Sequence, residues 1–286
     1  MPEAPLVVQA TAGDVAHFAR RRYQEEHGRA LYSDVAHVAP NGTFVAKDAG
    51  TPIGIAIAHA LEDEWFLSEL YVEPSFRESG VGWELLKAVA EDAGDVTRSG
   101  LLHPDELGGI AFFLRRGVAV HTPVLEVSGE IPHENEIARM AAGEYRFNTE
   151  QLDPVRHRTA VGQLDREVRG TARPLDHLYF SERGRGFLFA RGEELAGYAY
   201  VWPSGRIGPV VAASQSYLIQ MLSFALAALR QTFGASWCTM MVPGTNVRIM
   251  RASMRAGLSI GAVRLFASDG AILDLSRYVG FHSLLF

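Results

Sequence analysis

The amino-acid sequence predicts an α/β fold of the α+β kind, in which one unit occurs twice, each a mixed, mostly antiparallel sheet flanked by helices. Three observations support this fold class. Strand-like and helix-like hydrophobic patterns alternate along the chain, the second half repeats the order of the first, and two short segments of the first half recur in the second. The 286 residues suffice for two domains of ordinary size.

The first half is predicted to begin with a strand and a helix and to continue as a meander of strands. After a turn that contains Gly80 and Gly82, apolar residues recur at helical spacing, which indicates an amphipathic helix. Gly117 has the position of a glycine that ends a helix. The expected strands are 6–10, 43–47, 53–60, 66–72, 96–102 and 118–127, and the expected helices are 14–27, 81–93 and 105–116.

The second half shows the same order of patterns. Residues 53–57 resemble residues 196–200, and residues 114–118 resemble residues 254–258, at offsets close to half the chain length. This spacing favours a tandem duplication. The expected helices are 155–169, 218–229 and 246–255, and the expected strands are 187–190, 195–202, one that ends at 210–211, 237–242 and 262–267.

The domain organisation follows from the duplication and from a polar, interrupted stretch around Pro132. We interpret this stretch as a connector. The sequence therefore predicts an N-terminal domain over residues 1–130, a connector over residues 131–143 and a C-terminal domain over residues 144–286.

Composition and charge limit the classes of partner. With 27 Lys+Arg against 33 Asp+Glu the net charge is −6, which does not favour binding to nucleic acid or to an anionic membrane. Cys238 is the single cysteine, and its apolar neighbours predict a thiol in a core strand. The ten histidines show no metal-ligand spacing. Because no 18-residue apolar run and no signal-peptide pattern occur, we expect a cytoplasmic protein.

The segment from residue 67 to 86 is the most informative for function. An apolar strand runs into a turn that opens a helix, and Gly80 and Gly82 remove side chains where an anionic ligand would approach the main chain. The amides from Ser79 to Gly82 and the helix dipole favour a pyrophosphate there, and Arg77 can add a charge or hold the loop. The alternative is a tight strand-to-helix turn with a solvated Arg77. Neither a dinucleotide fingerprint nor a Walker loop fits the spacing.

This segment resembles the coenzyme A motif of the GNAT superfamily of N-acetyltransferases. The stretch from Leu70 to Pro74 matches the family pattern L-x-V-x-P, and the stretch from Arg77 to Gly82 matches the pattern (R/Q)-x-x-G-x-(G/A). A Leu-Leu pair follows in the helix, as in the family. The resemblance implies a tandem GNAT protein with acetyl-CoA as co-substrate, whose thioester lies between the diverging ends of two strands. It assigns the pantetheine arm to the main chain of Leu70, Tyr71 and Val72, and the pyrophosphate to Arg77, Glu78, Ser79, Gly80, Val81 and Gly82.

Acyl transfer to an amine needs a base for the amine and an acid for the departing thiolate. Glu69 is the first candidate base, because it precedes the predicted pantetheine-binding residues and matches a position that is often acidic in the superfamily; an exposed strand carboxylate is the alternative. His103, just after a strand end, is the second candidate. Phe113 stands where the family usually has a tyrosine as acid, so either Tyr71, another residue or solvent would serve instead, or the thiolate would leave unassisted.

The corresponding turn of the second half lacks the paired glycines and contains Pro209, so we expect no coenzyme A there. The chain resembles tandem GNAT proteins of bacteria whose C-terminal GNAT domain is degenerate and helps to shape the acceptor cleft. Two groups of residues stand out in this half. Asp165, Arg169 and Arg173 are interpreted as solvated helix charges or as groups facing the cleft, and Tyr198, Tyr200 and Trp202 as packing between the halves or a pocket lining.

The sequence thus predicts an N-acyltransferase that moves acetyl from acetyl-CoA to a primary amine of a small molecule by direct attack in a ternary complex. Cys238 is not expected to form an acyl-enzyme. We expect no metal, no nucleic acid or membrane partner, and a monomer or homodimer. Two alternatives remain, a non-catalytic acyl-CoA binding or sensing protein, which the presence of Phe113 favours, and an interaction scaffold.

Overall fold

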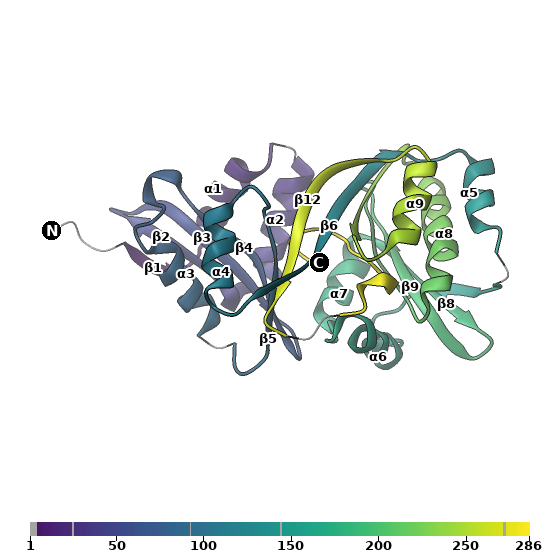
Figure 1. Ribbon diagram of the computed structural model, residues 1–286, viewed down its shortest axis with the longest axis horizontal. Helices are drawn as coiled ribbons and strands as arrows, with labels where there is room; N and C mark the ends of the chain where they lie inside the picture. The colour runs from purple at the N-terminus through teal and green to yellow at the C-terminus, as the bar shows by residue number, and fades with distance from the viewer. Residues whose placement is uncertain (1–4, 25, 92, 144, 271–272) are drawn as a thin grey trace. The chain divides into compact units, whose positions relative to one another are not determined.

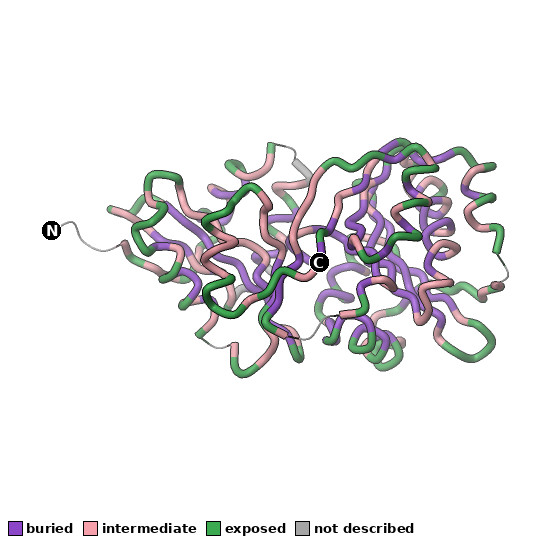
Figure 2. The backbone as a smooth tube through the Cα atoms, in the orientation of Figure 1, coloured by how far each residue is buried: buried purple, intermediate pink, exposed green. Residues whose placement is uncertain are grey.

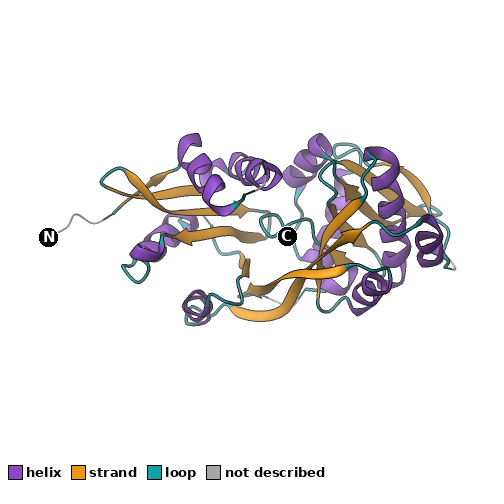
Figure 3. Ribbon diagram, turned by 90° about the horizontal axis from the view of Figure 1, so that it is seen from above, coloured by secondary structure: helices purple, strands orange, loops and turns teal. Residues whose placement is uncertain are grey.

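The described residues form a mixed α/β fold in which runs of strands are separated by helices (Figure 1, Figure 3). The computed structural model describes residues 5–24, 26–91, 93–143, 145–270 and 273–286. Internal contacts divide the chain into two units, Met1–Gly100 and Leu101–Phe286.

The first unit has its strands in the spatial order β1-β2-β3-β4-β5. Neighbours from β1 to β4 are antiparallel, whereas β4 and β5 are parallel. The strands are β1 Leu6–Gln9, β2 Thr43–Asp48, β3 Thr51–Ala60, β4 Glu64–Val72 and β5 Thr97–Leu102, and the helices are α1 Ala12–Arg22, α2 Glu26–Val38 and α3 Val81–Ala90.

Helices α1 and α3 cover opposite faces of this sheet. The ring of Tyr71 in β4 packs against Phe18 of α1, with 5.8 Å between ring centroids. Val72, the next residue, lies beside α3, and successive side chains of a strand point to opposite faces. The central strand β3 is accordingly buried from Ile53 to His59 (Figure 2).

The second unit contains a five-stranded antiparallel sheet in the order β13-β10-β9-β8-β7 and a group in which β6 pairs with both β11 and β12. The strands are β6 Ala119–Glu130, β7 Asn148–Gln151, β8 Arg185–Arg191, β9 Glu194–Val201, β10 Ile207–Ala212, β11 Trp237–Pro243, β12 Ser259–Ser268 and β13 Tyr278–Val279. The helices are α4 Leu107–Leu114, α5 Glu134–Ala141, α6 Arg158–Arg169, α7 Pro174–Arg183, α8 Gln215–Phe233 and α9 Val247–Arg255.

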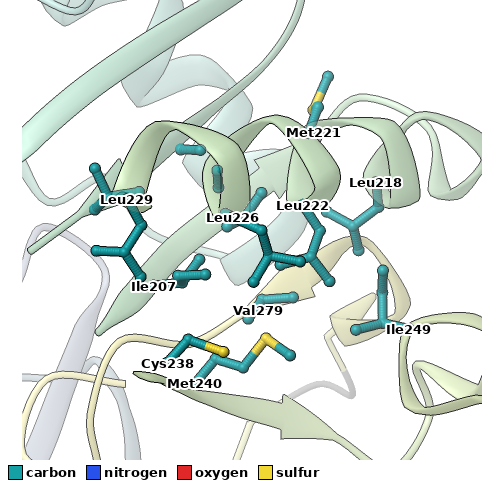
Figure 4. Packing of buried hydrophobic residues seen from close by; sticks show 14 of the residues in the cluster. Ile207, Leu218, Met221, Leu222, Leu226, Leu229, Cys238, Met240, Ile249 and Val279 are labelled. Carbon is teal, nitrogen blue, oxygen red and sulfur yellow. The ribbon is translucent and has the colours of Figure 1, made fainter. Parts of the chain in front are cut away.

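The hydrophobic core of the second unit forms around α8. Leu218, Leu222 and Leu226 recur at helical spacing on α8 and are fully buried together with Cys238 of β11 (Figure 4). The prediction of Cys238 as a core thiol is confirmed, and burial raises the pKa of this thiol to about 12.

Most expected elements are present, and several further elements were not predicted. The expected helix 14–27 ends at Arg22, and a second helix, α2, follows; β7, α7 and β13 were also not predicted. The stretch interpreted as a connector contains α5, which packs against α8, and Ile137 of α5 belongs to the core of the second unit.

The strand expected to close the first half, β6, pairs instead with strands of the second half. Its partners β11 and β12 lie more than a hundred residues further along the chain. The observed division after Gly100 therefore comes earlier than residue 130. The ranges 1–130, 131–143 and 144–286 follow the repeated element order and stay a prediction; residues 1 and 144, where two of them begin, lie outside the described residues.

Candidate functional site

A β-bulge interrupts β4 in the middle of the predicted site. Glu69 lies opposite Ile57 and Leu67 lies opposite Ala58, so Ser68 is an extra residue in β4. A bulge bends its strand and increases the local twist. The parallel ladder with β5 runs from Glu64 to Leu67, where Leu67 lies opposite Gly100, and β4 continues beyond it to Val72.

The turn after β4 has the backbone of an open helix start. Gly80 is the N-cap of α3 with φ 88°, and Glu78 also has a positive φ of 70°. Gly80 is required here because a side chain is disfavoured in the left-handed region. Arg77 donates from Nε to the carbonyl of Val72 at 3.2 Å, so its guanidinium ties the turn back to the end of β4.

The amides at the start of α3 match the predicted anion site. Trp83 and Glu84 both donate to the carbonyl of Gly80, so the N–H groups of Val81 and Gly82 precede the first intrahelical bond. A Cβ at Gly82 would meet only Val72 Cγ2, at an ordinary 3.6 Å. Packing within the protein therefore does not require glycine at this position, whereas a ligand that approaches the main chain would. The turn fits a diphosphate.

Glu69 lies on the α1 side of β4 and is paired. Its Oε1 is 3.4 Å from Nη2 of Arg22, the last residue of α1, and its side chain is 9% exposed. The guanidinium of Arg22 also lies 4.9 Å from the ring centroid of Tyr71. Glu69 and Tyr71 thus share one face of the strand, and the alternative of an exposed strand carboxylate is wrong.

A second ion pair lies next to the first. Arg21 donates from Nε and Nη2 to the two carboxylate oxygens of Glu73, at 2.7 and 2.8 Å. The hydroxyl of Tyr71 donates to the same carboxylate at 3.2 Å. Arg22 of α1 therefore pairs with Glu69 in β4, and Arg21 pairs with Glu73, the residue after β4. Tyr71 lies between the two glutamates along the chain.

Tyr32 of α2 is a residue that sequence reasoning missed. Its side chain is fully buried, and its hydroxyl has no hydrogen-bond partner among the residues that the structure describes. Burial raises the pKa of Tyr32 well above its usual value; the charge of Glu69 raises it further, and that of Arg22 opposes it. The hydroxyl of Tyr32 therefore stays protonated.

His103 and Phe113 belong to the second unit. His103 follows β5, and its carbonyl accepts from the amide of Glu106 at 3.2 Å. Phe113 lies in α4, packed edge-to-face against Phe112. Glu69 belongs to the first unit, and the proposed base role of His103 stays a prediction.

The matching turn of the second unit is filled by contacts of its own. The hydroxyl of Ser214 accepts from the amide of Ser216 and caps α8. Arg277 donates to the carbonyl of Ala213 at 3.1 Å. Ser214 thus caps α8 where Gly80 caps α3, and the expected loss of coenzyme A binding in this half stays a prediction.

The interpretation of Asp165, Arg169 and Arg173 as solvated charges is wrong, because all three are buried. Asp165 accepts from the hydroxyl of Tyr198 at 2.5 Å and lies 2.8 Å from Nε2 of His177. Burial alone would raise the pKa of Asp165, but His177, Arg173 and Tyr198 lower it overall.

The network continues through the core of the second unit. Nδ1 of His177 lies 3.0 Å from the hydroxyl of Tyr200, and Arg173 donates to the hydroxyl of Tyr278 at 2.8 Å. The sequence did indicate that Asp165 is buried. Asp165 is spaced with Val161, Leu164 and Val168 on the apolar face of α6, which is an unusual position for a solvated carboxylate.

Within the described ranges, no three His, Cys, Asp or Glu side chains are grouped so as to hold a metal ion. No helix among these residues has the length and apolar character needed to cross a membrane.

Comparison with known proteins assigns the first part of the chain. Residues 13–118 match the model for the Acetyltransferase (GNAT) family, whose members use acyl-CoA. This segment contains the bulged strand, the glycine turn and α3. A comparison of sequences with curated proteins gave no match.

Solved structures match the whole chain. A protein from Pyrococcus horikoshii, provisionally assigned as an acetyltransferase, is 16% identical with a TM-score of 0.75, over 99% of this chain and 96% of the other. A GCN5-related N-acetyltransferase from Sphaerobacter thermophilus is 13% identical with a TM-score of 0.64, over 97% and 99%. A tandem GNAT protein from the clavulanic acid biosynthesis pathway is 14% identical with a TM-score of 0.60, over 94% and 99%.

At these identities the structures establish the fold alone. Together with the family match, they define the class of this protein: the fold is that of tandem GNAT proteins over nearly the whole chain. Within the chain, the match to the GNAT acetyltransferase family covers residues 13–118.

Proposed function

We propose that the protein is an N-acetyltransferase that transfers the acetyl group of acetyl-CoA to the primary amine of a small molecule. The observation that carries the proposal is the turn before α3. The N–H groups of Val81 and Gly82 precede the first intrahelical hydrogen bond, and packing within the protein does not require glycine at position 82. The main chain of Leu70, Tyr71 and Val72 would hold the pantetheine arm. The residues from Arg77 to Gly82 would hold the diphosphate.

The bound cofactor supplies an acetyl group on a thioester that an amine can attack. Glu69 removes a proton from the acceptor ammonium, directly or through one water, so that the amine nitrogen becomes nucleophilic. The bulge at Ser68 supports a position for the acetyl thioester beside β4, because β4 continues past the end of its ladder with β5. The nitrogen forms the amide bond as the carbon–sulfur bond breaks, and the thiolate takes up a proton from solvent or from a nearby hydroxyl. No covalent intermediate on Cys238 is needed, because this thiol is buried with a raised pKa.

Gly82→Trp tests the cofactor site. Its side chain would fill the space beside Val72 and should lower acetyl-CoA affinity, measured by calorimetry, by about tenfold or more. Lys87→Trp is the matched control, since Lys87 is an exposed residue of the same helix and should retain wild-type affinity. Equal affinity in both variants would contradict the proposed site.

Glu69→Gln tests the base. We expect kcat for thiol release to fall by about 10²-fold or more while the affinity for acetyl-CoA is unchanged. A wild-type protein that binds acetyl-CoA but releases no thiol with any amine would instead favour the non-catalytic binding or sensing protein.

A further inference from the structure

An exposed tryptophan follows the proposed diphosphate turn directly. Trp83 is the third residue of α3 and is 39% exposed, whereas Val81, Leu85 and Leu86 of the same helix are buried. A single exposed hydrophobic side chain is ordinary on a soluble protein. Trp83 differs in that it stands in the first turn of α3, next to Gly82.

The indole of Trp83 extends towards the open end of α3. The Cα–Cβ bonds of a helix tilt towards its N-terminus, so a long side chain covers the turn before its own position. Helix α3 begins at Val81 with Gly80 as its N-cap, so no helical turn precedes Trp83. Its ring therefore lies at the end of the helix where the N–H groups of Val81 and Gly82 precede the first intrahelical bond.

The space beside this end of the helix is open. Apart from its chain neighbours, a Cβ at Gly80 would meet nothing within 4 Å, and one at Gly82 would meet only Val72 Cγ2 at 3.6 Å. Lys87, one turn further along, has its Nζ 2.7 Å from a carboxylate oxygen of Glu84 and 6.0 Å from the ring centroid of Trp83. This distance is at the outer limit of a cation–π contact. A ligand on the turn can therefore reach the exposed part of the ring.

The nucleotide of coenzyme A is the part of the cofactor that suits this ring. In coenzyme A the diphosphate joins the pantetheine arm to an adenosine, and a single ribose separates the diphosphate from the adenine. Because the arm is assigned to the main chain of β4, the nucleotide is left for the residues around the start of α3. A purine is a flat aromatic ring, and such rings stack on tryptophan and remove its apolar surface from water.

We propose that Trp83 stacks on the adenine of acetyl-CoA and thereby makes the protein select the free coenzyme as its acyl donor. This proposal rests on the proposed acetyl transfer and names its donor specificity. An acyl group on the phosphopantetheine arm of a carrier protein has the same thioester but no adenine, so it lacks this contact. Trp83 takes no part in the bond changes, and its effect falls on donor binding.

The test compares two donors that share the thioester and the arm. Acetyl-CoA carries the nucleotide, whereas acetyl-phosphopantetheine ends at the first phosphate. In calorimetry, Trp83→Ala should bind acetyl-CoA more weakly by about tenfold or more, the effect of losing one base–aromatic stack. The same variant should bind acetyl-phosphopantetheine as the wild type does. Trp83→Phe keeps an aromatic ring and should retain most of the affinity for acetyl-CoA.

Trp237→Ala is the matched control, because Trp237 is also an exposed tryptophan, at 53%, and has no role in the proposal. It should keep the wild-type affinity for both donors. Fluorescence gives an independent readout: adenosine 3′,5′-bisphosphate, the nucleotide fragment of coenzyme A, should quench the tryptophan emission of the wild type and of Trp237→Phe but not of Trp83→Phe. In turnover, Trp83→Ala should raise KM for acetyl-CoA and leave kcat unchanged.

The proposed function and the proposed adenine contact fail in different ways. No binding of acetyl-CoA by the wild type would contradict the proposed function itself. Three results would overturn the adenine contact alone: an acetyl-CoA affinity that is unchanged in Trp83→Ala, an equal loss of affinity for both donors, or quenching that persists in Trp83→Phe.

Discussion

Two glycines of the same turn should respond in opposite ways to alanine. Gly80 has φ 88° and a Cβ there would meet nothing within 4 Å, so Gly80→Ala costs only backbone strain, about 1–2 kcal/mol. Gly82 lies inside α3, and its added Cβ would make an ordinary contact with Val72 at 3.6 Å. Gly82→Ala should therefore stabilise the first unit by about 0.5–1 kcal/mol through helix propensity.

Urea unfolding followed by circular dichroism measures both changes, and hydrogen exchange of peptides that cover α3 locates them. Gly42→Ala serves as a steric control, because its Cβ would lie 2.0 Å from the carbonyl of Ala58 and should destabilise by overpacking. A Gly80→Ala variant as stable as the wild type, or a Gly82→Ala variant that loses about 1 kcal/mol or more, would contradict these expectations.

Three further predictions concern the second unit. The pKa of His282 lies well below its usual value because of burial, and then because of Arg206 and Arg264, so the unfolded chain binds the proton more readily. The contribution of neutral His282 to the free energy of unfolding should be fully present above about pH 6.5 and fall by up to about 1.4 kcal/mol per pH unit below it. Urea titrations of His282→Gln should no longer show this slope. Asp165→Asn should lower the free energy of unfolding by about 3–5 kcal/mol at pH 7, since it leaves buried cations uncompensated. Because the pKa of Asp165 is lowered in the folded protein, the difference from the wild type should shrink as the pH falls below about 4, and a constant difference would contradict this account. Cys238 should be unreactive towards a thiol reagent until the protein is unfolded, and rapid labelling of the native protein would show that the core opens.

The features that local sequence determines were the ones predicted well. Paired glycines after an apolar strand predicted the turn, and the left-handed conformation of Gly80 and the start of α3 at Val81 agree. The positive φ of Glu78 was not predicted, because a glutamate carries no preference for it. Helix α2 had a usable signal, since its buried residues Leu31 and Val35 are spaced as on one helix face, but the polar residues around them obscured it.

Pairings between distant segments could not be predicted in the same way. The alternation in β6 shows a strand, yet nothing in it specifies that β11 and β12 will be its neighbours rather than strands of the first half. The same holds for the site. Glu69 was found from its place in a motif, whereas its partner Arg22 comes from a helix 47 residues earlier and Tyr32 from a helix that was not expected.

The bulge at Ser68 connects the fold to the proposed chemistry. In a regular strand Leu67 and Glu69 would point to the same face, because they are two residues apart. With Ser68 inserted, they lie opposite the adjacent residues Ala58 and Ile57, and hence on opposite faces. The same extra residue bends β4 at the point where its ladder with β5 ends. One insertion therefore turns Glu69 towards α1 and Arg22 and opens the strand edge where a thioester would have to lie, so the position of the base and the room for the cofactor have one structural cause.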